Sequence, residues 1–323
     1  MRPSPRGPDP DRPTLITIVD QAEIPPAFRG GYLAIGNFDG VHRGHARLIA
    51  RLRAAADLDE APALALTFDP SPAALLRPEK APTPLTWIER RAALLVEAGA
   101  TEVGVFETGP WLLGLTAREF FDRILVGRFA ARGLVEGPSF GFGRDRGGDS
   151  ALLAAWCREA GLTFHSADVT DLDGRLVSST RVRGALAEGD VAEACRLLGR
   201  PHRVRGVVES GKGRGRGLGF PTANLGGVDT QIPADGVYAG RVFLDGETVG
   251  RPAAVHVGAN ATFGETRRTV EVYIIDFDRD LYGSLVQADF IEHLRTSQKF
   301  SNVGELLRQI KEDIRGSRLA LGV

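Results

Sequence analysis

Short apolar runs alternate with amphipathic helical stretches between Leu15 and about Arg183. A capping box, in which Thr116 is followed three residues later by Glu119, marks the start of one helix. The pattern predicts strands at residues 32–35, 64–68, 102–106, 134–136 and 163–169, and helices at 45–56, 87–98, 150–160 and from Thr116 onward. Such alternation is typical of an α/β fold with a parallel, doubly wound sheet, whose ligands bind at the carboxyl ends of the strands.

The pattern changes after a short predicted helix at residues 191–198. Runs rich in β-formers at 204–208, 237–244, 253–257, 270–277 and 285–290 have no helix between them, which indicates a small antiparallel β-barrel. Asn302 and Glu305 give the start signal of a terminal helix, predicted at 303–315. We therefore expect two domains, at residues 15–185 and 186–323, behind a proline-rich, disordered tail at residues 1–14.

Composition and charge exclude several classes of protein but do not indicate a particular function. The chain has 323 residues and a net charge of -1, from 40 Lys+Arg against 41 Asp+Glu. Binding along a nucleic acid needs a broad basic surface, so no nucleic-acid partner is expected. No segment approaches the roughly 18–20 apolar residues of a membrane span, and no membrane association is expected. The N-terminus lacks the apolar core of a signal peptide, and two distant cysteines suggest no disulfide framework or metal cluster, so we expect a cytoplasmic protein.

The first candidate site is GNFDGVHRGH at residues 36–45, between a predicted strand and a predicted helix. Glycines let the backbone approach a ligand, and the start of a helix offers free N–H groups to phosphate. His42 and His45 lie three residues apart and should face one side of the first turn, where both imidazoles can contact a polyphosphate. Two ordinary surface histidines are the alternative, which the flanking glycines disfavour. The residues assigned to ATP or phosphate binding are Gly36, Asn37, Phe38, Asp39, Gly40 and Gly44.

A second candidate site is SSTRVR at residues 178–183, which follows Asp173-Gly174 and precedes a helical run. Hydroxyl groups at a helix N-terminus and an arginine one turn later can hold another phosphate, which assigns Ser179, Thr180 and Arg183. Taken alone, this segment would be an ordinary helix cap. Its occurrence in one chain with the histidine pair makes the phosphate-binding interpretation more specific.

The third candidate site is a glycine-rich, basic segment that ends in Pro-Thr-Ala-Asn at residues 221–224. A flexible basic loop or a nucleic-acid patch is the alternative, which the rigid ending disfavours. The segment also lacks the GxxxxGK[ST] order of a Walker loop. Thr222 and Asn224 are two residues apart and should point the same way, where they suit Mg²⁺ and a phosphate oxygen. The remaining phosphate-binding assignments are Gly211, Lys212, Gly215, Arg216, Gly219 and Pro221.

These motifs carry a resemblance over nearly the whole chain. The HxGH signature resembles the nucleotidylyltransferase superfamily, and GNFDGVHRGH, SSTRVR, LLGRP, GRGLGFPTANL, GVYAG and DFDRDLYG occur in the order found in bacterial bifunctional riboflavin kinase/FAD synthetases. The resemblance implies a Rossmann-like FMN adenylyltransferase domain, which converts FMN to FAD and releases pyrophosphate. It also implies a barrel that phosphorylates riboflavin to FMN. ATP and Mg²⁺ would serve the reactions, with flavins and ATP as the small-molecule partners.

The resemblance also implies roles for individual residues. Glu271 matches the general base of the kinase, a role that suits a carboxylate beside a hydroxyl nucleophile. Arg295 matches the flavin-side arginine, and Phe140 lies in a segment implied to bind flavin. Thr222 and Asn224 match the residues that serve the metal and the phosphates. His42, His45 and Arg183 are the implied catalytic residues of the adenylyltransferase, where they offset charge on the phosphates.

Several positions depart from the family pattern, mostly in the N-terminal half. Ser71 replaces a histidine, Ser139 replaces Asp or Asn, and Leu176 stands where an arginine is frequent, with Arg175 displaced by one. We therefore expect adenylyltransferase activity that is weaker than the kinase activity. In the kinase half, Ala261 and Ser297 depart from the usual residues but spare Glu271.

Three other functions stay open at this point. The chain could be a riboflavin kinase with a weak or inactive adenylyltransferase module, or a non-catalytic flavin-binding or regulatory protein. An HxGH transferase for another acceptor, such as a pantetheine phosphate, would leave the C-terminal half unexplained. The oligomeric state is left open.

Overall fold

The computed structural model describes residues 17–20, 24–168, 170–210, 217–259 and 268–323. The predicted tail at residues 1–14 lies outside these ranges, as do four residues assigned to phosphate binding, Gly211, Lys212, Gly215 and Arg216. Contacts divide the chain into two compact units. The first consists of residues 1–82 and 88–170, and the second of residues 83–87 and 171–323. The predicted domain boundary between residues 185 and 186 stays a prediction.

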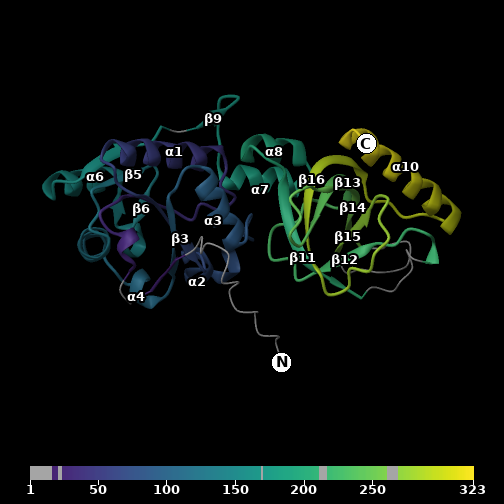
Figure 1. The fold of residues 1–323 in the computed structure, drawn as a ribbon, viewed down its shortest axis with the longest axis horizontal. Coiled ribbons are helices and arrows are strands. Elements are labelled where there is room, and N and C mark those ends of the chain that lie inside the picture. Colours follow the sequence, from purple (N-terminus) through teal and green to yellow (C-terminus); the bar gives the residue numbers. More distant parts are fainter. Residues whose placement is uncertain (1–16, 21–23, 169, 211–216, 260–267) are drawn as a thin grey trace. The chain divides into compact units, whose positions relative to one another are not determined.

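The first unit is built on a six-stranded sheet in the order β1-β4-β3-β2-β5-β8, in which all neighbouring strands run parallel. Strands β3 and β5 of this sheet are labelled in Figure 1. A separate two-stranded sheet joins β6 to β7. This arrangement confirms the parallel sheet that the alternating pattern predicts. The strands are β1 Thr17–Val19, β2 Tyr32–Ile35, β3 Ala63–Asp69, β4 Glu102–Glu107, β5 Gly133–Glu136, β6 Gly141–Phe142, β7 Gly148–Asp149 and β8 Thr163–Ser166.

Helices cover both faces of this sheet, so the central strands β2, β3, β4 and β5 are mostly buried on both sides. Leu33 and Ile35 of β2 pack in one apolar cluster, whereas Tyr32 and Ala34 pack in a second cluster. Helix α1 contributes to the second cluster, and α6 to the first. The helices are α1 Arg43–Leu58, α2 Pro72–Leu76, α3 Ile88–Glu97, α4 Pro110–Leu113, α5 Ala117–Glu119 and α6 Ser150–Glu159, with η3 Phe120–Arg128 a π-helix and η1 Pro26–Phe28, η2 Pro78–Lys80 and η4 Arg144–Arg146 3-10 turns.

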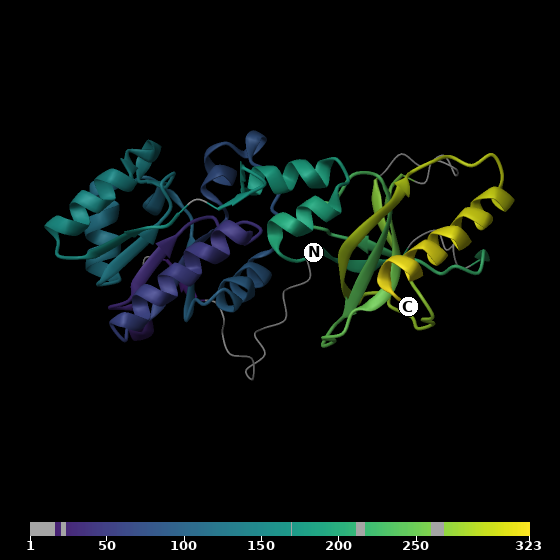
Figure 2. The same ribbon diagram turned by 90° about the horizontal axis from the view of Figure 1, so that it is seen from above.

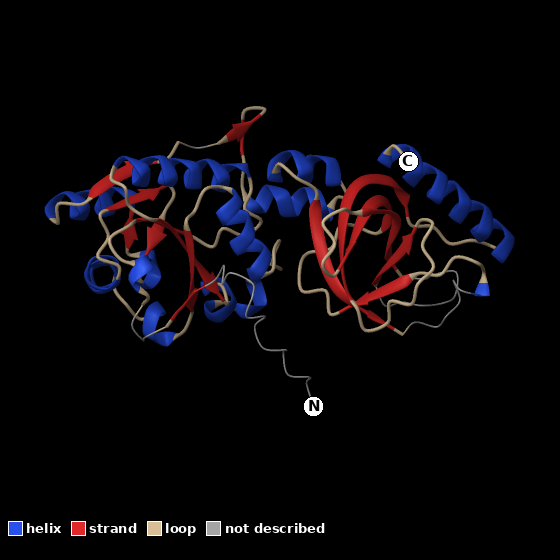
Figure 3. Cartoon of the chain, in the orientation of Figure 1, coloured by secondary structure: helices blue, strands red, loops and turns tan. Residues whose placement is uncertain are grey.

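The second unit contains a closed antiparallel barrel with a long C-terminal helix beside it (Figure 3). Its strands follow the order β11-β12-β15-β14-β13-β16, and helix α10 contacts β13, β14 and β16. A short hairpin, β9–β10, and helices α7 and α8 precede the barrel. The bounds are β9 Asp171–Leu172, β10 Arg175–Leu176, α7 Ser179–Ala187, α8 Val191–Leu198, β11 His202–Glu209, β12 Ala223–Gly226, β13 Gly236–Leu244, β14 Arg251–Gly258, β15 Thr269–Ile274, β16 Leu285–Thr296 and α10 Val303–Leu321.

Helices α7 and α8 lie beside the barrel (Figure 2), and both contribute side chains to the apolar core of the second unit. Val191, Ala194, Leu197 and Leu198 fall on one stripe of α8 and are buried in the same cluster as the barrel residues. Residues 83–87 join this unit too, because Leu85 is buried in that cluster and the backbone N–H of Gln231 donates to the Pro84 carbonyl at 2.8 Å. The segment is therefore a packed part of the second unit.

Several predicted bounds need correction. Helix α1 starts two residues earlier than predicted because His42 caps it, and β8 ends at Ser166 rather than at residue 169. Strand β16 runs six residues past its predicted end, with irregularities in its pairing to β13 that let a mainly polar stretch stay in the barrel. Helix α10 continues to Leu321 rather than ending at residue 315. The capping box of Thr116 and Glu119 is confirmed.

Candidate active sites

The HxGH segment forms a tight loop between β2 and α1. Phe38, Gly40 and Val41 all have positive φ, which turns the chain sharply after the buried strand. The rings of His42 and His45 stack with their centroids 3.7 Å apart and their planes 17° apart. A Cβ on Gly44 would lie 3.1 Å from the His42 ring, so glycine leaves room for this stack. The structure thus brings the two histidines together as expected, while their catalytic role stays a prediction.

His42 is the N-cap of α1, and this capping bond determines the tautomer of its ring. The His45 backbone N–H donates to His42 Nδ1 at 3.3 Å. A nitrogen that accepts a hydrogen bond carries no proton, so the neutral ring has its proton on Nε2. His42 is also 94% buried, since only 6% of its surface is exposed. The opposite ring nitrogen is therefore a donor suited to a phosphate oxygen.

A buried arginine that no sequence motif indicates, Arg91, supports the loop. The Arg91 guanidinium on α3 donates to Thr67 Oγ1 and to the Phe68 carbonyl, each at 3.2 Å. Thr67 Oγ1 in turn donates to the Asn37 carbonyl at 3.1 Å. Arg91 also lies 3.8 Å from the carboxylate of Asp39, and only 7% of its surface is exposed. This network connects the predicted ATP loop to strand β3 and helix α3.

The residues that depart from the family pattern have other partners or are exposed. Ser71 Oγ accepts from the Ala74 N–H at 3.3 Å and caps the short helix α2. Ser139 is exposed, and its carbonyl accepts from Arg146 at 3.2 Å. Phe140 stacks on Phe142, with centroids 5.5 Å apart, at the edge of the first apolar cluster. None of these contacts tests a role in binding, so the assignment of Phe140 to flavin binding stays a prediction.

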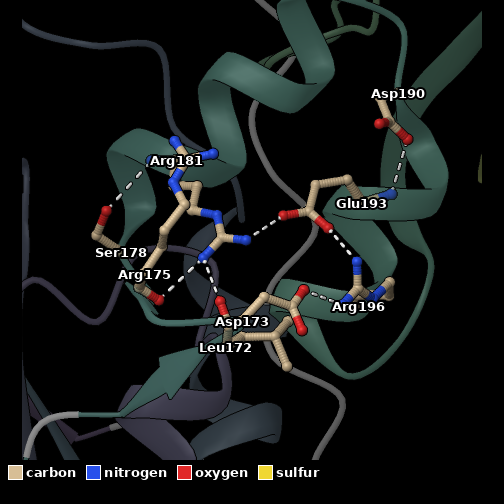
Figure 4. A network of polar contacts seen from close by, with 8 residues as sticks. All are labelled: Leu172, Asp173, Arg175, Ser178, Arg181, Asp190, Glu193 and Arg196. Carbon is tan, nitrogen blue, oxygen red and sulfur yellow. Dashed lines mark hydrogen bonds and ion pairs between the residues drawn. The ribbon is translucent and has the colours of Figure 1, made fainter.

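The SSTRVR segment opens helix α7 in the second unit, with Ser178 as its cap (Figure 4). Ser179 and Thr180 follow in the first turn, as expected. The Arg181 side chain donates to the carbonyls of Leu172 and Arg175 at 3.1 and 3.0 Å. Arg181 also pairs with Glu193 on α8 at 2.5 Å (Figure 4). Arg181 therefore joins the hairpin β9–β10 to both helices.

The assigned arginine of this segment, Arg183, lies apart from the network around Arg181. Its Nε donates to the Thr83 carbonyl at 3.1 Å, and its own carbonyl accepts from Gln231 at 2.9 Å. Ser179, Thr180 and Arg183 belong to the second unit, whereas the histidine pair belongs to the first. Their shared role in phosphate binding stays a prediction.

Two residues predicted to serve the kinase step, Asn224 and Glu271, come together through strand register. Asn224 on β12 lies directly across from Glu271 on β15, and Glu271 lies directly across from His256 on β14. Direct cross-strand partners point to the same face of a sheet, with Cβ atoms about 4.5–5.5 Å apart. The Thr269 hydroxyl lies 3.4 Å from Glu271 Oε1 and 3.1 Å from the Gly258 carbonyl. The predicted base and the predicted metal-binding amide are therefore neighbours.

His256 is a further residue of this face, and no sequence motif indicates it. Its Nε2 is 3.2 Å from Ser297 Oγ, and Ser297 donates to the Val257 carbonyl at 3.3 Å. Burial lowers the pKa of His256, while the charge of Glu271 opposes that shift and Arg295 adds to it. Only the alternation of β14 could have indicated that this histidine faces outward from the apolar barrel core.

Arg295 of β16, assigned to flavin, makes a two-point ion pair with Asp313 of α10, with distances of 2.8 and 2.7 Å. Asp313 is 8% exposed and also accepts from Gln309 at 3.0 Å. The Arg295 guanidinium lies 5.8 Å from the centre of the Phe300 ring. This pair fastens the terminal helix to the barrel, and the contact of Arg295 with flavin stays a prediction.

Thr222 and Asn224, the residues predicted to bind Mg²⁺, carry oxygen atoms of the kind that this ion prefers as ligands. Thr222 precedes β12 and Asn224 lies in it, and both are half-buried. Hydroxyl and amide oxygens are ligands of Mg²⁺, which takes its other ligands from water and phosphates. Gly219 has positive φ and Pro221 is exposed just before these residues. Among the described residues there is no group of three or more His, Cys, Asp or Glu that could hold an ion alone.

A doubly wound sheet with a histidine pair after a central strand defines a nucleotidyl-transferring class of domain, and here it is joined to a six-stranded barrel. The family model for FAD synthetase matches residues 24–181, and the model for riboflavin kinase matches residues 198–321. The bifunctional riboflavin kinase/FMN adenylyltransferase of Pseudomonas fluorescens is 39% identical over 91% of this chain and 94% of that protein. The protein of the same name from Escherichia coli K12 is 36% identical over 88% of this chain and 90% of the relative.

The chain therefore belongs to the family of bifunctional riboflavin kinase/FMN adenylyltransferases. The predicted family, fold and pair of enzyme activities are confirmed. A crystal structure from Streptococcus pneumoniae, described as a macrolide-efflux protein, matches with a TM-score of 0.83 and 31% identity over 94% of this chain and 99% of that one. None of the helices in the described ranges has both the length and the apolar content needed to cross a membrane.

Proposed function

We propose that this chain makes FMN from riboflavin with residues 186–323 and FAD from FMN with residues 15–185, using ATP in both steps. Membership of a family named for both activities is the observation that carries this proposal. Flavins and ATP are the proposed partners, and the near-zero net charge supports the absence of a nucleic-acid partner. The cytoplasm is the proposed location, because cysteines without a disulfide framework suit a reducing compartment.

In the kinase step, Glu271 is the proposed general base. Its carboxylate takes the proton of the ribityl 5′-hydroxyl while that oxygen bonds to the γ-phosphorus of ATP, and the bond to ADP breaks. The position of Asn224 directly across from Glu271 supports this assignment, because it places a phosphate- or metal-binding amide beside the base. Thr222 and Asn224 would hold Mg²⁺, which when bound neutralises charge on the transferred group.

In the adenylyltransferase step, His42 and His45 are proposed to bind the phosphates of ATP. An oxygen of the FMN phosphate bonds to the α-phosphorus, and pyrophosphate leaves with the electrons of the broken bond. The neutral His42 ring donates from Nε2, which its capping bond leaves protonated. Ser179, Thr180 and Arg183 are proposed as a second phosphate-binding group at the start of α7.

We expect the second step to be slower than the first. Ser71, Ser139 and Leu176 stand where the family pattern has groups suited to phosphate or flavin, and the Ser71 hydroxyl already caps α2. Loss of one charge-assisted contact lowers a rate by roughly 10- to 100-fold. His42, His45 and Arg183 are retained, which supports a weakened rather than an absent activity.

One assay tests the proposal. The purified chain is incubated with riboflavin, ATP and Mg²⁺, and FMN and FAD are separated over time. FMN should accumulate first and FAD should follow. FMN without FAD, also when FMN is supplied, would rule out the adenylyltransferase. Formation of neither product would rule out both activities and favour a flavin-binding protein.

A further inference from the structure

Strand β5 of the first unit ends in a carboxyl group that lies inside the protein. Glu136 is 2% exposed, and its Oε1 accepts from the backbone N–H of Ile35 at 2.7 Å. Burial raises the pKa of this carboxyl well above its ordinary value, although the Ile35 bond opposes the shift. Burying a carboxyl group costs free energy unless the group is hydrogen-bonded, so the bond to Ile35 offsets part of the cost of burying Glu136.

The hydrogen bond from Ile35 to Glu136 takes the place of a backbone hydrogen bond between β2 and β5. Strands β2 and β5 pair at Tyr32 with Gly133 and at Leu33 with Leu134, and the pairing ends there. Gly36 donates toward β3, to the Leu66 carbonyl, so the amide of Ile35 points toward β5. The Glu136 side chain, rather than a β5 carbonyl, accepts from this amide. The two strands therefore separate at their carboxyl ends without leaving the Ile35 amide unsatisfied.

The separation lies where a ligand is expected. Strand β2 has β3 on one side and β5 on the other, so the order of strands reverses at the β2–β5 edge. In parallel sheets, ligands bind in the crevice at such a reversal. The ATP loop begins at Gly36, the residue after Ile35. On the β5 side, a Cβ added to Gly137 would meet no heavy atom within 4 Å.

We propose that Glu136 is a positioning residue of the adenylyltransferase step, which holds the first residues of the Gly36–Gly44 loop in the place that ATP requires. The inference rests on the proposed binding of ATP to that loop. Glu136 acts through the Ile35 amide rather than through the reacting atoms. An apolar side chain of similar length would fill the same space but could not accept from Ile35.

The test compares Glu136→Met with Glu136→Gln. Gln keeps an oxygen acceptor, whereas Met is unbranched and of similar size but lacks one. For each variant, FAD formation from supplied FMN is measured at varied ATP, and FMN formation from riboflavin is measured in the same preparation. Glu136→Met should raise the KM for ATP in FAD formation about 10-fold, as expected for one unsatisfied amide. Glu136→Gln should stay within about 2-fold of the original chain, and FMN formation should not change.

Three results would overturn the inference: an unchanged KM in Glu136→Met, an equal effect of both variants, or an equal fall in FMN formation. Loss of a cooperative unfolding transition in Glu136→Met would also overturn it, because the residue would then hold the fold rather than the loop. The unsubstituted chain separates this inference from the proposed function. If it makes FAD but Glu136→Met keeps its KM, only the role of Glu136 is wrong. If it makes no FAD from FMN, both are wrong.

Discussion

In the barrel, Asn224, Glu271 and His256 are neighbours because three strands run in register, whereas the Gly36–His45 loop depends on side-chain bonds. In that loop, His42 caps a helix, Thr67 accepts from Arg91 and donates to Asn37, and Glu136 binds the amide that precedes the loop. A backbone ladder survives most substitutions of side chains, but a loop held by side chains does not. Substitutions outside the Gly36–His45 loop should therefore reduce its activity at more positions than substitutions outside the barrel site reduce the activity of that site.

The largest expected effect is on the kinase. Glu271→Gln removes the proposed base, so FMN formation should fall by about 10²- to 10⁴-fold, while FAD formation from supplied FMN stays unchanged. Chromatography of both products measures the two rates. Glu292→Gln, at an exposed carboxylate on β16, is the matched control and should leave both rates unchanged. An equal fall of both rates in Glu271→Gln would contradict the division of the two activities between the domains.

The next effect falls on the loop. His42→Ala removes both a phosphate donor and the cap of α1, so FAD formation should fall by about 10²- to 10³-fold. FMN formation serves as the internal control and should not change. His165→Ala, on β8 of the same unit, controls for loss of a histidine elsewhere. A His42→Ala protein with the original rate of FAD formation would remove the histidine pair from the mechanism.

A stability effect should follow in the barrel. Asp313→Ala leaves Arg295 without its two-point partner, so the free energy of unfolding of the second unit should fall by about 3 kcal/mol. The denaturant midpoint measures this change. Glu312→Ala alters a neighbouring carboxylate that is 60% exposed, and its effect should stay below about 1 kcal/mol. Equal shifts in the two variants would show that the Arg295–Asp313 pair is not what secures α10.

Acid should weaken the second unit through His256. Burial lowers the pKa of His256 in the folded state, so below about pH 6.5 the unfolded chain binds more protons. The second unit therefore has its full stability above that pH, where His256 is neutral, and loses stability as the pH falls and the unfolded chain takes up a proton at this residue. His256→Asn should therefore lose less stability than the original chain between pH 7 and pH 5, measured by thermal unfolding. A steeper loss in the variant would contradict the direction of this shift.

The first unit should respond in the opposite direction through Glu136. Because burial raises the pKa of Glu136, the folded state binds more protons than the unfolded state above about pH 4.3. The first unit therefore has its full stability with respect to Glu136 below that pH, where the carboxyl is protonated, and loses stability as the pH rises. Glu136→Gln should therefore gain stability relative to the original chain as the pH is raised from 5 to 8. A constant difference across that range would contradict the expectation.

Local signals explain which features the sequence could predict. Periodicity and glycine positions indicated the order β2, loop and α1, and strand alternation indicated the barrel. The sequence predicts the start of α1 two residues late because histidine is not a preferred cap. Glu136 and His256 were missed because their partners, Ile35 and Ser297, lie far away in the chain. Pairing between distant segments sets these roles, and no local pattern contains it.

Residues 83–87 belong to the second unit although residues on both sides belong to the first. The chain therefore passes between the units at three places: between residues 82 and 83, between 87 and 88, and between 170 and 171. A single cut cannot yield two intact halves. A fragment ending near residue 185 would keep the Leu85 segment but lose the barrel residues packed around it. A fragment starting near residue 186 would expose the surface that Leu85 and α7 cover. Proteolysis or gene division at the expected boundary should thus leave the first unit whole and divide the core of the second unit between the two fragments.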